Sequence, residues 1–273
     1  MASRANQKEA ARQARLAAEQ AAAERSARTR RLGTIAGVAV VAIIVAVVAI
    51  VVASNSGSKT STGLASTPTA AKATYAAVAS ELHGIPQSGT TLGNPKAPVT
   101  IQYFGDLECP VCRAFSLGEA GGGLPQLISG PVRSGQVKLV YKAFETASHT
   151  VNNDRFVPQQ VAALAAGQQG LFWDYAELFY HEQGSETTRY VTENYLDSLA
   201  KQIPTLNFAK WMSARRDAAL AAQVQTEGKL ALSYGLNGTP TLVALGPKAK
   251  EIVPAATGIP SYSEIQTAIK AVS

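Results

Sequence analysis

Cysteine is nearly absent from this chain of 273 residues: its two cysteines are Cys109 and Cys112, which stand three positions apart. Two cysteines cannot form the framework of a disulfide-rich secreted domain. Histidine is also scarce. A structural zinc site usually has four ligands, and none of His83, His149 and His181 forms a recognisable ligand pair with the two cysteines. We therefore expect no metal site.

The chain has little net charge beyond its first 31 residues. Residues 1–31 carry eight Lys or Arg against three Glu, which is a net charge of +5 and leaves only +1 of the chain's +6 for everything after them. A nucleic-acid-binding domain usually presents a strongly basic surface, so we expect no nucleic-acid partner. We interpret residues 1–31 as a basic cytoplasmic tail that attracts anionic lipid; a partner-binding helix is the alternative.

Residues 32–53 (LGTIAGVAVVAIIVAVVAIVVA) lack any charged side chain. A helix of these 22 residues, rising about 1.5 Å per residue, is long enough to cross a hydrocarbon core of about 30 Å. It also lacks the polar stripe of a surface helix. We predict an uncleaved transmembrane helix in the lipid bilayer. A cleaved signal peptide is the alternative, disfavoured by the length of the apolar run and of the basic tail before it.

The distribution of positive charge predicts the orientation of this span. The excess of Lys and Arg precedes it, and the positive-inside rule therefore places the N-terminus in the cytoplasm. We predict a single-pass protein of the cell membrane with an extracytoplasmic C-terminal part. Residues 54–75 are small and polar, which predicts a flexible linker. Residues 76–273 are numerous enough for one domain with a sizeable core.

The order of the elements expected within this domain indicates an α/β fold. The β-branched and aromatic runs at 99–104 and 137–144 predict buried strands. A helix begins between them at Cys109–Pro110, because Pro suits the first helical position, and Gly121–Gly123 interrupts it. Strand, helix, strand predicts a right-handed parallel unit. After it we expect a helical insertion over about 155–230, strands within 235–245 and 250–254, and a closing helix over 261–272 that Ser261 and Glu264 cap.

Three interpretations compete for the sequence Cys109–Pro110–Val111–Cys112. A structural disulfide across four residues closes too small a loop to stabilise the fold much. A zinc site lacks ligands. Redox chemistry remains: a cysteine at a helix N-terminus faces unpaired backbone N–H groups, which lower its pKa, and a second cysteine one turn later lies on the same face. This arrangement suits reversible exchange through a mixed disulfide.

The segments around this motif resemble one known family. FGDLECPVCRAF, preceded by APVTIQYF and followed far along the chain by GLNGTPTL, is similar to the DsbA-like thioredoxin-fold thiol:disulfide oxidoreductases. The lead-in GIPQSGTTLGNPKAPVT resembles membrane-anchored bacterial members, of an actinobacterial type. The resemblance covers about residues 84–273. It implies a thioredoxin-like fold, βαβ followed by ββα, with a helical subdomain inserted between the halves.

The resemblance also implies roles for individual residues. Cys109 matches the exposed nucleophile and Cys112 the more buried resolving cysteine, so the two form the redox disulfide. Thr239 and Pro240 match the loop in which a cis-proline faces that disulfide and backbone groups bind an extended substrate peptide.

The sequence departs from the family at three places near the motif. Pro110 and Val111 supply no histidine between the cysteines, so no side chain there helps the thiolate. Tyr103 stands where many relatives carry a buried acid, six positions before the first cysteine. Asp106 and Glu108 could move protons instead or could be solvated turn residues; in either case their negative charge raises the pKa of Cys109.

We therefore predict a membrane-anchored enzyme that introduces disulfides into secreted or cell-envelope proteins. No cofactor is needed, and the resemblance implies reoxidation by a membrane oxidase of DsbB-like or VKOR-like type. The alternatives are an extracytoplasmic disulfide reductase, for example in cytochrome c maturation, and a non-catalytic thioredoxin-fold binding module. The motif alone does not separate oxidase from reductase, because direction follows from the reduction potential against that of the compartment.

Overall fold

A computed structural model describes residue 64 and residues 67–148 and 154–273. The basic tail, the apolar run over 32–53 and His149 lie outside these residues. Within the described part of the chain, no helix combines the length and the apolar character that crossing a bilayer requires. The membrane span and its orientation therefore stay predictions.

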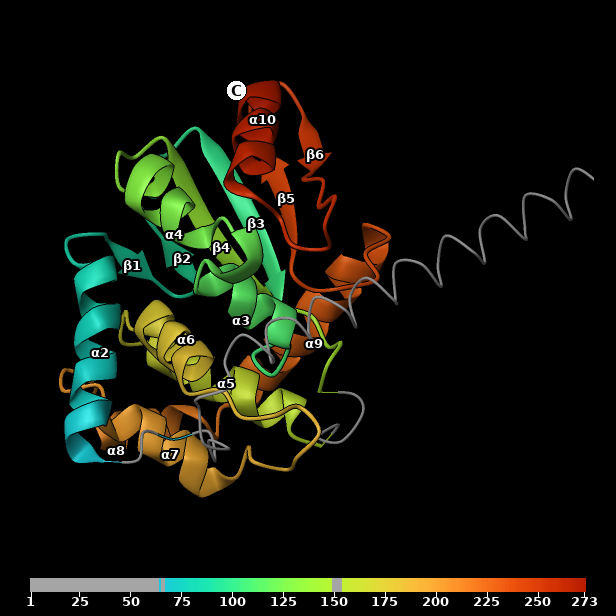
Figure 1. Ribbon diagram of the computed structural model, residues 1–273. Helices are drawn as coiled ribbons and strands as arrows, with labels where there is room; N and C mark the ends of the chain where they lie inside the picture. The colour runs from blue at the N-terminus through green and yellow to red at the C-terminus, as the bar shows by residue number, and fades with distance from the viewer. Residues whose placement is uncertain (1–63, 65–66, 149–153) are drawn as a thin grey trace, which may run out of the picture. The chain divides into compact units, whose positions relative to one another are not determined.

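Within the described residues, a six-stranded sheet in the order β1-β2-β4-β3-β5-β6 forms the centre of the domain (Figure 1). The central strand β3 (Val99–Gly105) pairs in parallel with β4 (Val137–Ala143) and antiparallel with β5 (Thr241–Leu245). The other strands are β1 (Gln87–Ser88), β2 (Thr91–Leu92) and β6 (Lys250–Ile252). The predicted parallel unit and the two later strands are confirmed, and the structure adds that the later strands pair antiparallel.

The register of the central strands brings three loops to one edge of the sheet. β3 and β4 run in parallel with Gly105 opposite Ala143, so the loops that follow both strands leave from the same edge. β5 runs the other way, with Thr241 opposite Phe104, so the loop that precedes β5 arrives there too. Both cysteines and the Thr239–Pro240 pair therefore meet at this edge.

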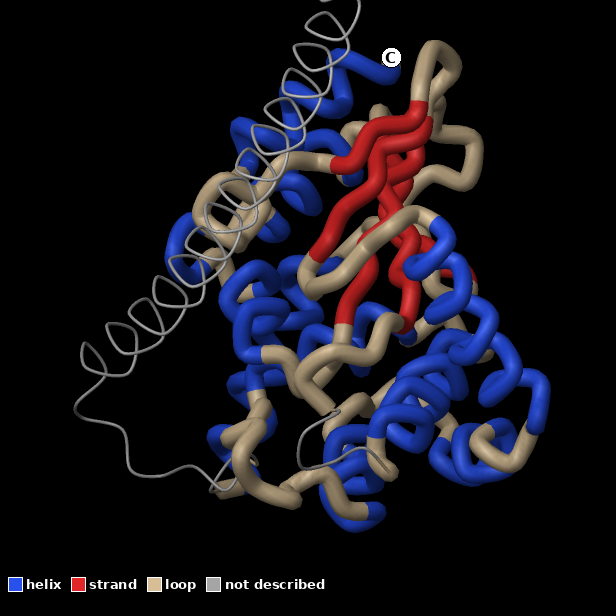
Figure 2. The backbone as a smooth tube through the Cα atoms, turned by 90° about the vertical axis from the view of Figure 1, so that its right-hand side faces the viewer, coloured by secondary structure: helices blue, strands red, loops and turns tan. Residues whose placement is uncertain are grey.

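The helices that follow β3 form two groups around the sheet. One group follows β3 and closes the chain: α3 (Pro110–Ser116), α4 (Leu124–Leu127) and α10 (Tyr262–Val272), with η1 (Glu119–Gly121) and η2 (Ile128–Val132) between α3 and β4. The other group is the helical insertion: α5 (Phe156–Gly167), α6 (Phe172–His181), α7 (Glu193–Lys201), α8 (Phe208–Ala214) and α9 (Ala218–Ser233). Figures 1 and 2 show most of this insertion gathered at one end of the sheet, the end near α3.

The helix after β3 ends earlier than the sequence suggests. α3 stops at Ser116 and Gly118 adopts a left-handed φ of 70°, so the chain turns before Gly121–Gly123. The glycines serve close packing instead. A Cβ atom on Gly122 would lie 2.6 Å from the Cα atom of Phe115, and one on Gly123 would lie 2.5 Å from the backbone N of Tyr262. This segment therefore packs closely against the backbone of both α3 and the start of α10.

The predicted flexible linker over 54–75 is wrong in its last part, because α2 (Pro68–Leu82) begins inside it. Thr67 caps this helix by accepting a hydrogen bond from the N–H of Ala70, and Pro68 takes the first helical position. The helix buries Val78 and Leu82. Small polar composition suggested a linker, but the capping residues and the alanines favour a helix.

The hairpin formed by β1 and β2 was not predicted. Each strand has two residues, and Gly89 makes the turn between them with a φ of 55°. β2 then pairs with β4, with Leu92 opposite Leu139. Such short strands leave no periodic pattern in the sequence.

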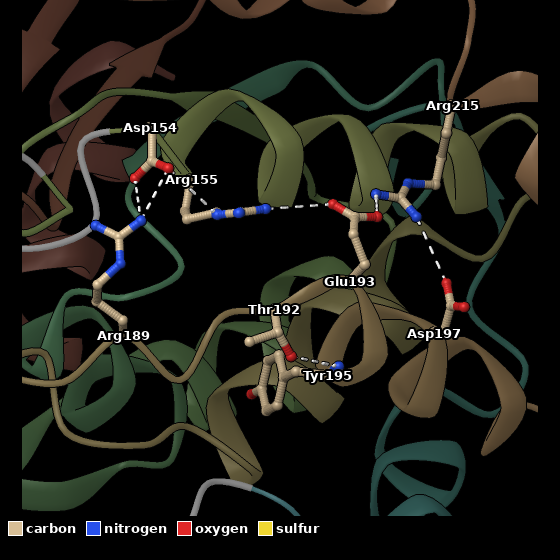
Figure 3. A network of polar contacts seen from close by, with 8 residues as sticks. All are labelled: Asp154, Arg155, Arg189, Thr192, Glu193, Tyr195, Asp197 and Arg215. Carbon is tan, nitrogen blue, oxygen red and sulfur yellow. Dashed lines mark hydrogen bonds and ion pairs between the residues drawn. The ribbon is translucent and has the colours of Figure 1, made fainter.

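Ion pairs link the outer helices of the insertion (Figure 3). Glu193 at the start of α7 accepts from Arg155 at 3.5 Å and from Arg215 at 2.6 Å. Arg215 also pairs with Asp197, and Asp154 pairs with Arg155 and Arg189. We call these six residues the Glu193 network. It fixes the segment before α5, the start of α7 and the end of α8 to one another.

Candidate active site

Cys109 lies where the turn after β3 becomes helix α3. It is the N-cap residue of α3, and its Sγ accepts a hydrogen bond from the N–H of Cys112 at 3.4 Å. Pro110 occupies the first helical position, which has no use for an N–H group. The predicted start of the helix is confirmed, and the backbone donor it supplies reaches the sulfur.

Both cysteines are free thiols in this structure, and both are buried. Cys109 is 5% exposed and Cys112 is 0% exposed. Cys109 is therefore less open than the exposed nucleophile that the resemblance implies, although it remains the more accessible of the two. A substrate thiolate therefore has only a small exposed surface of Cys109 to attack.

The loop that precedes β5 faces Cys109. The peptide bond between Thr239 and Pro240 is cis, as the resemblance implies. The thiol of Cys109 donates a hydrogen bond to the carbonyl oxygen of Thr239 at 3.4 Å, across 130 positions of sequence. The structure thus brings together the two motifs that the sequence singled out.

The two sulfurs have opposite electrostatic environments. The pKa of Cys109 is lowered, chiefly by a hydrogen bond with the Cys112 side chain and further by the Thr239 side chain and the Cys112 N–H; burial and the charge of Asp106 oppose this. The pKa of Cys112 is raised well above its usual value, chiefly because burial penalises the charged form. Of the two thiols, Cys109 therefore loses its proton more readily than Cys112.

Asp106 is not the solvated turn residue that the sequence left open. It is 0% exposed, and its carboxylate accepts hydrogen bonds from the N–H groups of Glu108, Thr146 and Ser148 and from the Ser148 hydroxyl, at 2.7–3.1 Å. These donors come from the turn after β3 and from the loop after β4. Asp106 therefore ties the two loops together, and its charge raises the pKa of Cys109 as expected.

Glu108 is also buried, at 1% exposure, so the solvated alternative is wrong for it as well. Its carboxylate accepts a hydrogen bond from the Gln159 side chain at 3.0 Å. Gln159, on α5, also donates to the Ser148 hydroxyl at 2.8 Å. Asp106 and Glu108 thus belong to one buried polar cluster that connects the cysteine loop with the helical insertion. The sequence indicated neither Ser148 nor Gln159.

Pro110 and Val111 contribute no polar side chain to the site. Val111 is half-buried and packs against the hydrophobic core. Stabilisation of the Cys109 thiolate therefore comes from the Cys112 N–H, the Cys112 thiol and Thr239.

Tyr103, six positions before Cys109, lies among other buried tyrosines. Tyr103 is fully buried, and its hydroxyl lies 3.1 Å from the hydroxyl of Tyr180. Its ring meets that of Tyr141 edge to face at 5.3 Å. Burial raises the pKa of Tyr103 well above its usual value, and the charge of Cys112 raises it further. A neutral phenol thus replaces the acid that many relatives carry here.

Comparison with known proteins points to one family. The family model described as Thioredoxin matches residues 87–271. Disulfide bond formation protein D of Bacillus subtilis is 24% identical over 151 residues, which is 55% of this chain and 65% of that protein. A protein of Bacillus anthracis, named as a probable disulfide bond formation protein D, is 23% identical over 157 residues, which is 57% of this chain and 69% of that protein.

Solved structures share the same fold. Oxidised BdbD from Bacillus subtilis superposes with a TM-score of 0.55 and 21% identity, covering 68% of this chain and 95% of that one. DsbA2 from Pseudomonas aeruginosa gives a TM-score of 0.51 and 20% identity, covering 70% of this chain and 97% of that one.

Fold and site together define a thioredoxin-fold domain with a helical insertion and a CxxC motif facing a cis-proline loop. The chain belongs to the thioredoxin family. The predicted resemblance to DsbA-like thiol:disulfide oxidoreductases is confirmed. Membrane anchoring and the actinobacterial type stay predictions.

Proposed function

We propose that this chain is a membrane-anchored thiol:disulfide oxidoreductase that introduces disulfides into secreted or cell-envelope proteins through Cys109 and Cys112. The observation that carries the proposal is the asymmetry of the two sulfurs. Cys109, at the helix N-terminus, has a lowered pKa, and Cys112 beneath it has a raised one. Stabilising a thiolate stabilises the reduced form, which makes the disulfide form a stronger oxidant.

The exchange begins with the oxidised pair. A substrate thiolate attacks the Sγ atom of Cys109, a sulfur–sulfur bond forms between them, and the Cys109–Cys112 bond breaks. Cys112 leaves with the electron pair and takes up a proton, because a buried thiolate is costly. Attack at Cys109 is favoured because it is the more exposed of the two sulfurs. In the next step its lowered pKa makes Cys109 the better leaving group.

The second step releases the product. A second substrate thiolate attacks the substrate sulfur of the mixed disulfide, and Cys109 leaves as a thiolate. The substrate has then lost two electrons and two protons, and the two enzyme cysteines have gained the electrons. The backbone of Thr239 lies beside Cys109. We propose that it pairs with an extended substrate segment during both steps.

Reoxidation requires an acceptor for the two electrons. We propose a membrane oxidase of DsbB-like or VKOR-like type as the partner, in keeping with the predicted membrane span over 32–53. The anchor would hold the domain within reach of that oxidase, with the N-terminus in the cytoplasm and the domain outside. Fractionation of cells that express the full chain, and a variant that lacks 32–53, tests the anchor: only the full chain should sediment with membranes.

The direction of exchange is tested with a model peptide that carries two cysteines. Oxidised full-length protein is mixed with the reduced peptide, and both are followed by mass. We expect the peptide to lose two hydrogens while the protein gains two. A protein that leaves the reduced peptide unchanged, but in its reduced form readily reduces the peptide's disulfide, would favour the reductase alternative.

A further inference from the structure

Gln183 stands two positions after the end of α6 and was not indicated by the sequence. Its side-chain Nε2 atom donates hydrogen bonds to two backbone carbonyl oxygens, that of Leu107 at 2.7 Å and that of Cys109 at 3.2 Å. An amide group has two hydrogens, so one serves each carbonyl. One side chain of the helical insertion thus binds the main chain of residues 106–109, which we call the cysteine turn, at two points.

These two contacts differ from the others made by the main chain of Cys109. The Cys109 N–H donates to the carbonyl oxygen of Asp106 at 3.1 Å, and the Cys109 carbonyl oxygen also accepts from the N–H of Arg113 at 3.0 Å. Both of those contacts are local, so they fix the shape of the turn and of the first turn of α3. Gln183 lies 74 positions after Cys109. It therefore fixes the place of the turn relative to the insertion.

The backbone around Gln183 is itself held in place. The hydroxyl of Tyr195, on α7, donates to the carbonyl oxygen of Glu182 at 3.0 Å, which ties the end of α6 to α7. Directly after Gln183 the chain packs against a ring, because a Cβ atom on Gly184 would lie 2.7 Å from the ring of Tyr190. A donor held by its neighbours in this way can in turn hold the groups that it binds.

The place of the Cys109 main chain decides which groups its sulfur meets. The Sγ atom is one bond beyond Cβ, so it moves with the backbone. It accepts from the N–H of Cys112 and donates to the carbonyl oxygen of Thr239, both at 3.4 Å. In the disulfide form a covalent bond to Cys112 holds this sulfur in any case. In the reduced form only these weaker contacts hold it, so the placement of the turn matters most to the reduced form.

We propose that Gln183 is a positioning residue for the redox site: its amide group holds the cysteine turn so that the Cys109 sulfur stays within hydrogen-bond distance of the Cys112 N–H. Through this side chain the helical insertion stabilises the reduced form, which makes the disulfide form a stronger oxidant. This inference deepens the proposed function and rests on Cys109 being the exchanging thiol.

The test compares Gln183→Met, which keeps the length of the side chain and removes both donors, with Gln169→Met. Gln169 is the matched control, because it is also a glutamine of the insertion and its Nε2 atom donates to a backbone carbonyl oxygen, that of Asn207, at 3.2 Å. Full-length protein is used, and the pKa of Cys109 is measured from the rate of alkylation against pH. Equilibrium with glutathione is measured on the same samples.

We expect the pKa of Cys109 to rise in Gln183→Met, because the sulfur spends less time beside the Cys112 N–H, and to stay unchanged in Gln169→Met. Equilibrium with glutathione should shift about threefold to tenfold towards the disulfide form in Gln183→Met, the range expected if the two redox forms differ by one hydrogen bond. The control should show no shift.

Denaturant unfolding of both variants separates positioning from stability. A Gln183→Met variant that is destabilised but keeps the original pKa of Cys109 would overturn the proposal, because the glutamine would then serve stability alone. The same rise of this pKa in Gln169→Met would also overturn it. If Gln183→Met does not fold, Gln183→Leu takes its place in the same comparison.

The alkylation readout also keeps the two proposals apart. It reports on the thiolate of Cys109 without any exchange partner. If the original protein never exchanges with glutathione, the proposed function fails, and the pKa of Cys109 in the variants still decides the role of Gln183.

Discussion

Two loops of the described domain each carry an aspartate in a polar network, and the two networks differ in burial. Asp106, in the turn after β3, is 0% exposed and accepts hydrogen bonds from Glu108, Thr146 and Ser148. Asp154, in the Glu193 network, has a side chain that is 51% exposed and pairs with Arg189 at 2.8 Å (Figure 3). The chemistry of the carboxylates is the same, and their surroundings differ.

Burial determines how strongly each carboxylate fixes the position of the groups that bind it. A buried carboxylate has lost its water and is stable only if protein donors replace that water, so its geometry is strongly specified. An exposed ion pair contributes little, because water and salt screen it. The donors to Asp106 come from the loops that carry Cys109 and Thr146, so this one side chain sets the geometry of the redox site. The Asp154–Arg189 pair, by contrast, lies at the surface of the insertion, where both side chains are more than half exposed.

The largest effect expected from the redox site is that of Cys109→Ser. A hydroxyl cannot form the disulfide, so exchange with a peptide dithiol should stop completely. Because the serine side chain fits the same space, the fold should persist, as circular dichroism would show. Continued exchange by this variant would mean that Cys109 is not the exchanging sulfur; an unchanged biological function would favour the binding-module alternative.

A large difference is also expected between the two thiols of the reduced protein. The pKa of Cys109 is lowered, so its thiolate persists at pH values below the ordinary thiol range, and its rate of alkylation should fall only when the pH drops below that lowered pKa. The pKa of Cys112 is raised and the side chain is fully buried, so alkylation should spare it across this range. Peptide mapping after a short alkylation checks both; equal labelling of the two cysteines would contradict the asymmetry.

Asp106→Ala sharpens the comparison between the two networks. It leaves three N–H groups and one hydroxyl without their acceptor, which we expect to destabilise the fold by about 3 kcal/mol. Denaturant unfolding measures this. The matched control is Asp154→Ala, which should leave the unfolding midpoint almost unchanged. If Asp154→Ala destabilised the fold as much as Asp106→Ala, burial would not explain the difference between the two carboxylates.

Asp106→Asn tests the effect of the Asp106 charge on the pKa of Cys109. It keeps the shape and removes the charge that raises the pKa of Cys109. The pKa of Cys109 in this variant should therefore fall below that of the original protein, provided that the variant still unfolds cooperatively. A rise would show that the loops, rather than the charge, dominate the effect of Asp106 on the thiolate.

The smallest effect is expected for Tyr103→Phe. It removes the hydroxyl that meets Tyr180 and keeps the ring that packs against Tyr141, so the loss should be about 1 kcal/mol of unfolding free energy. Tyr234→Phe is the control, because Tyr234 contacts Phe104 and Lys250 through its ring, which phenylalanine retains. An equal loss of unfolding free energy in both variants would show that the buried hydroxyl pair of Tyr103 and Tyr180 does not stabilise the fold specifically.

Local patterns predicted the elements that frame the site. The apolar runs predicted β3 and β4, the Cys–Pro pair predicted the start of α3, and Ser261 with Glu264 predicted the capping box of α10, which the structure contains. Each of these depends on neighbours within a few residues, so sequence spacing is enough to find it.

The misses at the site share one cause, which is that the deciding contacts are distant in sequence. The burial of Asp106 and Glu108 depends on Thr146, Ser148 and Gln159, about forty to fifty positions away. Nothing local marks these three as members of a site. A polar glutamine within the apolar run of α5 is the one available signal, because a buried amide needs partners.

The central claim is that the Cys109–Cys112 pair donates disulfides, and its most direct test is a redox titration of the full-length protein with glutathione, counting free thiols by mass. The thiolate environment of Cys109 predicts a reduction potential at or above about −200 mV, in the range of the disulfide-donating enzymes. A potential at or below about −270 mV would instead make the protein a reductant, and two thiols that never exchange with glutathione would contradict the redox account itself.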